Sequence, residues 1–167
     1  MKRYVLLSFT GLVILAVFGF IVIQFIPVAR YNPAVHTEPP WDSPQTKMLV
    51  ERACYDCHSN RTQWPWYSYI APFSWLVAHD VNEGRAALNF SLWNQPGGGE
   101  LMEEEAFEHE GNEGAEELIE VVREGEMPPP YYLWTHPQAR LTPQETQALI
   151  QGLQATFGRA NLSRVSQ

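Results

Sequence analysis

The segment Cys54-Tyr55-Asp56-Cys57-His58 decides the fold of this 167-residue chain, because it contains both of its cysteines. Two thiols separated by two residues can each bond to one of the two vinyl groups of a haem. A histidine directly after the second thiol is placed to donate a ring nitrogen to the iron. The motif therefore predicts one covalently attached haem c, bound through Cys54 and Cys57, with His58 as the proximal iron ligand.

A redox disulfide and half of a zinc site are the alternative interpretations of this motif. A thioredoxin-like pair needs a βαβ context, which the sequence lacks, and a structural zinc site needs a second pair of ligands. Haem attachment is the preferred interpretation because no cysteine is left over.

The N-terminus carries a long apolar run. Residues 4–27 contain no charged side chain, and Lys2 and Arg3 precede them. Such a run makes a helix of ~36 Å, enough to cross a hydrocarbon core of ~30 Å, and the preceding positive charges keep its start in the cytoplasm. We therefore expect a single-pass anchor in the cytoplasmic membrane, with the haem domain on the extracytoplasmic, periplasmic side. A cleaved signal peptide is the alternative.

The rest of the chain is expected to be helical, because no segment alternates as a strand does. Ser43 is a plausible N-cap, and Thr142 with Glu145 forms a capping box. Start and stop signals predict helices over residues 44–57, 73–88 and 143–157. The predicted fold is all-α, a small cytochrome c-like helical domain behind one N-terminal transmembrane helix. The predicted parts are an anchor at 1–30, a proline-rich stalk at 31–42, a haem-binding domain at 43–160 and a tail at 161–167.

Charge is distributed unevenly along the chain. Three of the eleven basic residues lie at or before Arg30 and all nineteen acidic residues follow it, so residues 31–167 carry a net charge of -11. Residues 100–126 alone contain twelve glutamates, and one or two short helices are expected there. This excess excludes nucleic acid as a partner, since nothing would neutralise its phosphates. It predicts a redox protein partner with a basic docking patch.

Haem iron usually takes a sixth ligand, and Met127 is the leading candidate. It follows the acidic stretch and precedes Pro128 and Pro129, which stiffen the loop that would present its thioether. His136, His79 or an open position are the alternatives.

Aromatic residues follow the motif closely. Taken singly they are more often core residues, but beside a haem they can also exclude water from it. Arg85 is a candidate partner for a haem propionate, with a surface arginine as the alternative. The carbonyl group of Pro65 or Pro72 is expected to accept a hydrogen bond from the second ring nitrogen of His58. The residues expected to wall the porphyrin are Trp64, Trp66 and Tyr69.

Several short segments beyond the motif form a wider pattern. They are Cys54–His58 with Ser59-Asn60, Trp64–Ser68, Ala71-Pro72, Ser74-Trp75, Glu83–Arg85, Leu88–Ser91, Met127–Pro129, His136-Pro137 and Ala139–Leu141. Over residues 46–157 this pattern resembles the bacterial haem-binding domain family with a single CxxCH, which is similar to cytochrome c in its attachment motif. The resemblance implies a haem site without implying a particular partner. The glutamate-rich stretch at 100–117 departs from the family pattern. It contains none of the residues expected to bind the haem, so the predicted haem ligands are unaffected.

These observations predict a membrane-anchored monohaem c-type cytochrome that transfers single electrons and is a carrier rather than an enzyme. Membership of a larger membrane electron-transfer complex stays open. One alternative is a haem-based sensor or small-ligand binder with an exchangeable sixth ligand. Another is a peroxidase-like haem enzyme, for which His79 or His136 would supply the acid-base group.

Overall fold

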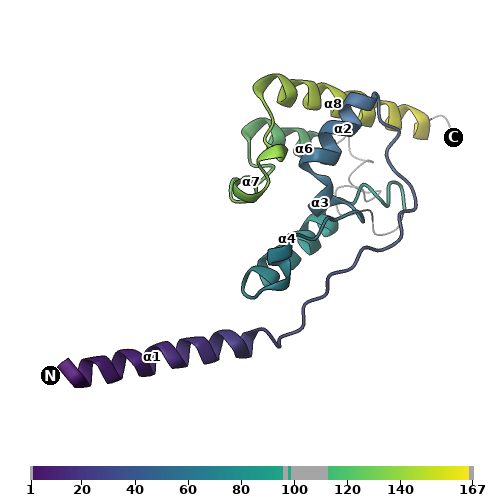
Figure 1. The fold of residues 1–167 in the computed structure, drawn as a ribbon. Helices are drawn as coiled ribbons and strands as arrows, with labels where there is room; N and C mark the ends of the chain where they lie inside the picture. Colours follow the sequence, from purple (N-terminus) through teal and green to yellow (C-terminus); the bar gives the residue numbers. More distant parts are fainter. Residues whose placement is uncertain (1, 96–97, 99–112, 166–167) are drawn as a thin grey trace. The chain divides into compact units, whose positions relative to one another are not determined.

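The computed structural model describes residues 2–95, 98 and 113–165, and within its helices it describes no side chains for residues 2–7, 113–115 and 158–165. The described residues form helices and one isolated bridge between Thr37 and Leu92, without a named strand. The elements, shown in Figure 1, are α1 (Lys2–Ile23), α2 (Pro44–Ala53), α3 (Tyr55–His58), η1 (Trp66–Tyr69), α4 (Phe73–Ala87), α6 (Glu113–Glu124), α7 (Tyr132–Thr135), η3 (Pro137–Ala139) and α8 (Pro143–Val165).

The predicted transmembrane helix is not found among the residues that the structure describes. The side chains of α1 are described from residue 8 to Ile23. No helix among the described residues is long and apolar enough to cross a membrane. The predicted fold class was therefore wrong in its transmembrane helix, and the predicted single-pass location in the cytoplasmic membrane was wrong with it.

By its internal contacts the chain divides into two compact units. We call residues 1–31 with 64–80 the N-terminal unit, and residues 32–63 with 81–167 the motif unit. The division falls within α4. The Cys54–His58 motif lies in the motif unit.

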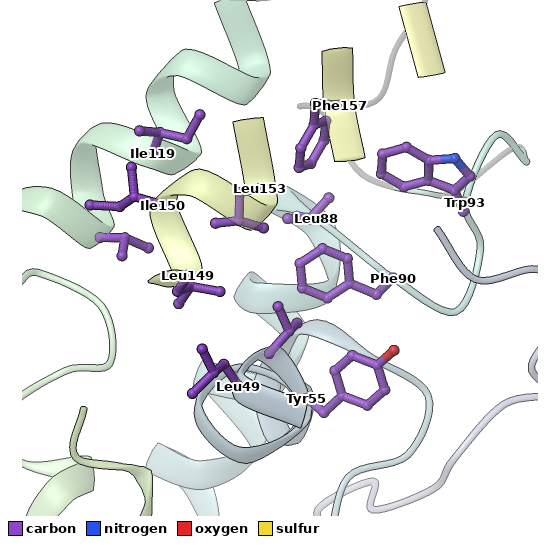
Figure 2. Packing of buried hydrophobic residues seen from close by; sticks show 12 residues of the cluster. Leu49, Tyr55, Leu88, Phe90, Trp93, Ile119, Leu149, Ile150, Leu153 and Phe157 are labelled. Atoms are coloured by element: carbon purple, nitrogen blue, oxygen red, sulfur yellow. The ribbon is translucent and has the colours of Figure 1, made fainter. Parts of the chain in front are cut away.

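The core of the motif unit is built around α8, which contacts both α2 and α6. Leu149, Leu153 and Phe157 repeat at helical spacing and are all buried, so they form the inward face of α8. Figure 2 shows them beside Leu49 of α2 and Ile119 of α6. The motif thus directly follows a helix, α2, that is fixed by a continuous apolar core.

The predicted helix starts are confirmed. The Ser43 side chain accepts a hydrogen bond from the Thr46 backbone N–H at 3.2 Å, and Pro44 is the first residue of α2. At the start of α8 the Thr142 N–H donates to the Glu145 carboxylate at 2.8 Å, and the Glu145 N–H donates to the Thr142 hydroxyl at 3.2 Å. These bonds satisfy backbone N–H groups that have no partner inside the helix.

Two predicted helix ends were wrong. α2 ends at Ala53 instead of continuing to Cys57, because Cys54 leaves helical geometry at φ -124° and ψ -32° before α3 begins. α8 continues past Gly158 to Val165. Of the acidic stretch, residues 100–112 lie outside the described residues, and Glu113–Glu124 form α6.

The N-terminal unit connects the chain after α1 to residues 64–73, which include η1 and which we call the aromatic segment. The Gln24 amide makes two hydrogen bonds with the Ala71 backbone, donating to its oxygen at 3.2 Å and accepting from its N–H at 2.9 Å. Arg30 donates to the Ser68 carbonyl at 3.1 Å, and its guanidinium lies 4.5 Å from the centre of the Tyr69 ring. These polar contacts hold the aromatic segment within its own unit.

Candidate functional site

The motif forms one tight turn at the junction of α2 and α3. The Cys54 N–H still donates to Val50 of α2 at 2.8 Å, while the Cys54 carbonyl accepts from the N–H groups of Cys57 at 3.2 Å and His58 at 2.9 Å. A helical turn places residues three apart on the same face. No disulfide joins the two cysteines, and both are half-buried. Two thiols in this arrangement suit two bonds to one flat ligand.

The His58 ring is oriented by the backbone that follows α4. Its Nδ1 atom lies 3.2 Å from the Leu88 carbonyl oxygen, which can only accept, so Nδ1 carries the proton and donates. The lone pair is then on Nε2, the nitrogen that a metal would bind. The predicted acceptor, Pro65 or Pro72, was wrong: the structure places Leu88 in that role.

The environment of His58 favours the neutral ring. Burial lowers the pKa of His58, and the carbonyl groups of Leu88 and Gly84 offset part of this effect by favouring the charged form. A metal competes with a proton for the imidazole lone pair, so a lowered pKa assists coordination.

Helix α4 packs directly on the motif through Gly84. A Cβ atom added to Gly84 would lie 2.7 Å from the Cys57 carbonyl oxygen and 2.9 Å from its Cβ atom. Only a residue without a side chain permits this approach. Gly84 therefore fixes the distance between α4 and the second cysteine. Sequence reasoning quoted it within the family pattern but did not identify it as a site residue.

A buried polar network holds the chain directly after His58. The Phe90 N–H donates to the His58 carbonyl at 2.9 Å, and the Asn89 amide donates to the Asn60 side-chain oxygen at 2.9 Å. The Ser91 hydroxyl accepts from the Asn60 backbone N–H at 2.9 Å. Residues 88–91 thus supply the acceptor for His58 and also bind the residues that follow it.

Arg85 stabilises the same region from α4. Its Nε atom donates to the Ser59 carbonyl at 2.9 Å, and its Nη2 atom lies 2.9 Å from the Thr62 hydroxyl and 3.0 Å from the Asn32 amide oxygen. The guanidinium therefore braces the backbone that leaves the motif. Its expected contact with a haem propionate stays a prediction.

Asp56, in the middle of the motif, joins it to α7. Its Oδ2 atom accepts a hydrogen bond from the Tyr132 hydroxyl at 2.8 Å, and its Oδ1 atom accepts from the Gln63 N–H at 2.9 Å. The Tyr132 ring stacks on the ring of His136 with centroids 4.0 Å apart and an interplanar angle of 9°. Sequence reasoning missed Tyr132, since nothing local signals a bond across 76 positions.

The loop that follows α6 carries Met127. Gly125 ends the helix with φ +75°, a backbone conformation that glycine adopts without strain, and the Met127 N–H donates to the Val121 carbonyl at 3.3 Å. The Met127 side chain is 39% exposed. Its role as sixth ligand stays a prediction, as do the alternatives His136, half-buried in the motif unit, and His79, exposed in the N-terminal unit.

The aromatic residues expected to wall a porphyrin belong to the N-terminal unit. Trp66 and Tyr69 are exposed, at 75% and 59%, and Trp64 is half-buried. Their contact with a cofactor stays a prediction.

The two alternative interpretations of the motif find little support. Burial, together with the neighbouring Cys57, raises the pKa of Cys54 to about 12, whereas catalytic dithiols need a lowered thiol pKa. No group of three or more His, Cys, Asp or Glu side chains within the described part of the chain is arranged to hold a metal ion. Two thiols on one turn that no disulfide joins, together with an imidazole whose Nε2 lone pair is available, fit a haem instead.

Comparison with known proteins agrees with this fit. A protein-family model described as "Haem-binding domain" matches residues 18–155, which is well over half of the chain. No curated protein and no solved structure shows a significant match.

Proposed function

Because this chain belongs to the haem-binding domain family, we propose that it is a monohaem c-type cytochrome. Cys54 and Cys57 would bind one haem through thioether bonds, and His58 would bind its iron. The observation that carries this proposal is the hydrogen bond from His58 Nδ1 to the Leu88 carbonyl. It orients an Nε2 lone pair beside two thiols that share one turn.

The haem, when bound, supplies one-electron redox chemistry. The chain's own residues prepare the site for it. Leu88 fixes the tautomer of His58, and burial of the ring favours its neutral form. A ring that is already oriented and deprotonated at Nε2 needs little rearrangement during ligation. We propose one-electron transfer as the work of this protein.

Met127 is our proposed sixth ligand. It lies in the motif unit, and the adjacent α7 is hydrogen-bonded to Asp56 of the motif through Tyr132. A thioether is also a ligand that favours the reduced iron of an electron carrier.

A second candidate function is a haem-based sensor or small-ligand binder with an exchangeable sixth ligand. The 39% exposure of Met127 favours it, because an exposed ligand on a loop leaves more readily than a buried one. The two candidates differ in whether an added ligand replaces Met127 under ordinary conditions.

The redox partner that we propose is a protein with a basic docking patch. The supporting observation is a run of exposed acidic side chains along α6 and directly after it, next to Met127. Arg123 lies among them and is paired with Glu120. Opposite charges on two redox proteins speed their encounter. The exposed acidic residues are Glu116, Glu117, Glu120, Glu124 and Glu126.

The decisive experiment is the intact mass of the full chain produced in a host that attaches haem c. We expect the polypeptide mass increased by one haem, with a haemochrome spectrum typical of two thioether bonds. Cys54→Ser with Cys57→Ser should abolish the increase, and the exposed Met48→Leu control should retain it. A wild-type mass equal to that of the polypeptide alone would contradict the proposal.

The sixth ligand is tested on the same holoprotein. Met127→Ala should remove the optical features of methionine-ligated ferric haem while the covalent attachment persists. Met48→Ala, on the exposed side of α2, is the matched control. An unchanged spectrum in Met127→Ala would exclude Met127 from the iron.

A further inference from the structure

We propose that Tyr132 is a positioning residue for the haem site, because its hydroxyl group fastens the loop that carries Met127 to Asp56 inside the Cys54–His58 motif. This inference rests on the proposed haem binding and deepens it. Tyr132 and Asp56 are 76 positions apart in the sequence, and their side chains meet at 2.8 Å.

Asp56 is a fixed acceptor. Its Oδ1 atom is occupied by the backbone N–H of Gln63 at 2.9 Å, and its backbone carbonyl accepts from the Thr62 hydroxyl at 2.7 Å. Its Oδ2 atom faces Tyr132. Since Asp56 lies two residues before His58, a group bonded to its carboxylate is held next to the iron-binding turn.

Tyr132 is also fixed by contacts within its own turn, residues 129–136. Its N–H donates to the Pro129 carbonyl at 3.0 Å, and its carbonyl accepts from the His136 N–H at 3.1 Å. The His136 ring stacks on the Tyr132 ring and lies with Nδ1 3.2 Å from the Tyr132 carbonyl. The phenol therefore projects from a short, internally bonded turn instead of a free chain end.

The loop between α6 and this turn is short and rich in proline. Met127 precedes Pro128, Pro129 and Pro130, and Tyr132 follows within five positions of Met127. Proline restricts the backbone, so fixing Tyr132 also limits the positions that Met127 can reach. Met127 is 39% exposed, so burial alone does not fully order it. The Tyr132–Asp56 bond supplies that order before ligation, which lowers the entropic cost of binding the iron.

The test measures how readily imidazole replaces the sixth ligand in the ferric holoprotein. Tyr132→Phe removes only the hydroxyl and keeps the aromatic ring, so folding and stacking on His136 should persist. We expect imidazole to bind roughly tenfold more tightly than to the wild type, the effect of losing a hydrogen bond to a charged group. The exposed neighbour Tyr131→Phe is the matched control and should show wild-type affinity.

A double variant separates positioning from a general structural effect. In a Met127→Ala background no methionine competes with imidazole. Adding Tyr132→Phe to this variant should therefore leave the affinity of the ferric holoprotein for imidazole unchanged. Asp56→Asn should lie closer to the wild type than Asp56→Ala, because an amide can still hydrogen-bond the phenol. The reduction potential should fall slightly in Tyr132→Phe and further in Met127→Ala, since weaker thioether ligation disfavours ferrous iron.

Two results would overturn the inference. One is wild-type imidazole affinity in Tyr132→Phe, and the other is an increase that persists unchanged in the Met127→Ala background. Intact mass, recorded first, keeps the outcomes distinguishable: a chain without covalently bound haem contradicts the proposed function, whereas a loaded chain with these affinities contradicts only the role of Tyr132.

Discussion

Gly84 of α4 lies against the backbone of Cys57, so close that an added Cβ atom would meet the Cys57 carbonyl oxygen at 2.7 Å. The atom it would meet belongs to the main chain and cannot rotate away. Relief requires movement of α4 or of the motif turn, and either movement disturbs the second cysteine together with His58.

Gly84→Ala should therefore destabilise the apoprotein. Alanine is favoured over glycine within a helix by about 1 kcal/mol, but overpacking against fixed atoms costs about 1–3 kcal/mol, so the steric effect prevails. Urea unfolding measures the change, with the exposed neighbour Glu83→Ala as control. We also expect a lower yield of haem-loaded protein. A midpoint at or above the wild-type value would contradict the close approach.

Asn89→Ala should lower the free energy of unfolding more than the same substitution at an exposed asparagine. Asn89 is buried, donates to the Asn60 side chain at 2.9 Å and accepts from the Ser91 N–H at 3.0 Å. Removing the Asn89 side chain leaves the Asn60 side-chain oxygen and the Ser91 N–H without these partners. Each unpaired buried group costs about 1–3 kcal/mol of stability. Asn82→Ala on the exposed side of α4 is the control. Equal unfolding midpoints for the two variants would show that the network contributes nothing.

The Cys54 thiol should be unreactive in the folded apoprotein. Burial raises the pKa of Cys54 to about 12, so at pH 8 almost none of it is thiolate, the form that reacts. In a Cys57→Ser variant, alkylation by iodoacetamide should be roughly a hundred-fold or more slower than for the same variant unfolded in urea. Equal rates in the two conditions would show that the sulfur is solvated.

Glu145 should make stability depend on acid pH. The Thr142 N–H and then the Arg52 guanidinium lower the pKa of Glu145, so its pKa in the folded protein lies below its pKa in the unfolded chain. The stabilising contribution is complete above the unfolded value and is lost as pH falls through the folded one.

Glu145→Gln should remove this dependence. Urea midpoints measured from pH 6 down to about pH 3 should fall less steeply than in the wild type. Glu124→Gln, exposed on α6, serves as control and should retain the wild-type slope. Parallel curves for all three proteins would mean that the capping carboxylate does not contribute through its charge.

Electron transfer with a basic partner should slow as salt is added. The proposed docking relies on the acidic side chains of α6, and at 0.1 M ionic strength such charges are screened over ~10 Å. Glu120→Gln with Glu124→Gln should reduce both the rate at low salt and its dependence on salt. Glu51→Gln, on α2, is the control. Electron-transfer rates that do not depend on ionic strength in any variant would exclude electrostatic docking.

Local sequence signals predicted the helix starts well. Ser43 and the Thr142–Glu145 pair act on N–H groups three residues away, so the residue types alone reveal the bonds. α4 also lies almost where it was expected, at Phe73–Ala87. The helix ends were less predictable, because the chain leaves helical geometry at Cys54 although no glycine or proline lies nearby as a sequence signal.

The partners of the motif were beyond prediction for a different reason. Every residue carries a backbone carbonyl, so nothing in the composition marks Leu88 as the acceptor for His58. The Tyr132–Asp56 bond joins two common residue types across the chain. The uncharged run at the N-terminus did predict the helix α1, but the number of apolar residues did not establish a membrane span.

The bonds from His58 to Leu88 and from Asp56 to Tyr132 span 30 and 76 positions. On the proposed function, a short peptide containing only Cys54–His58 would keep its haem through both sulfur atoms. Without Leu88 the His58 ring would rotate freely, and without the Met127 loop the opposite face of the iron would be open to solvent. Limited proteolysis of the holoprotein should thus release coloured fragments whose iron binds outside ligands indiscriminately.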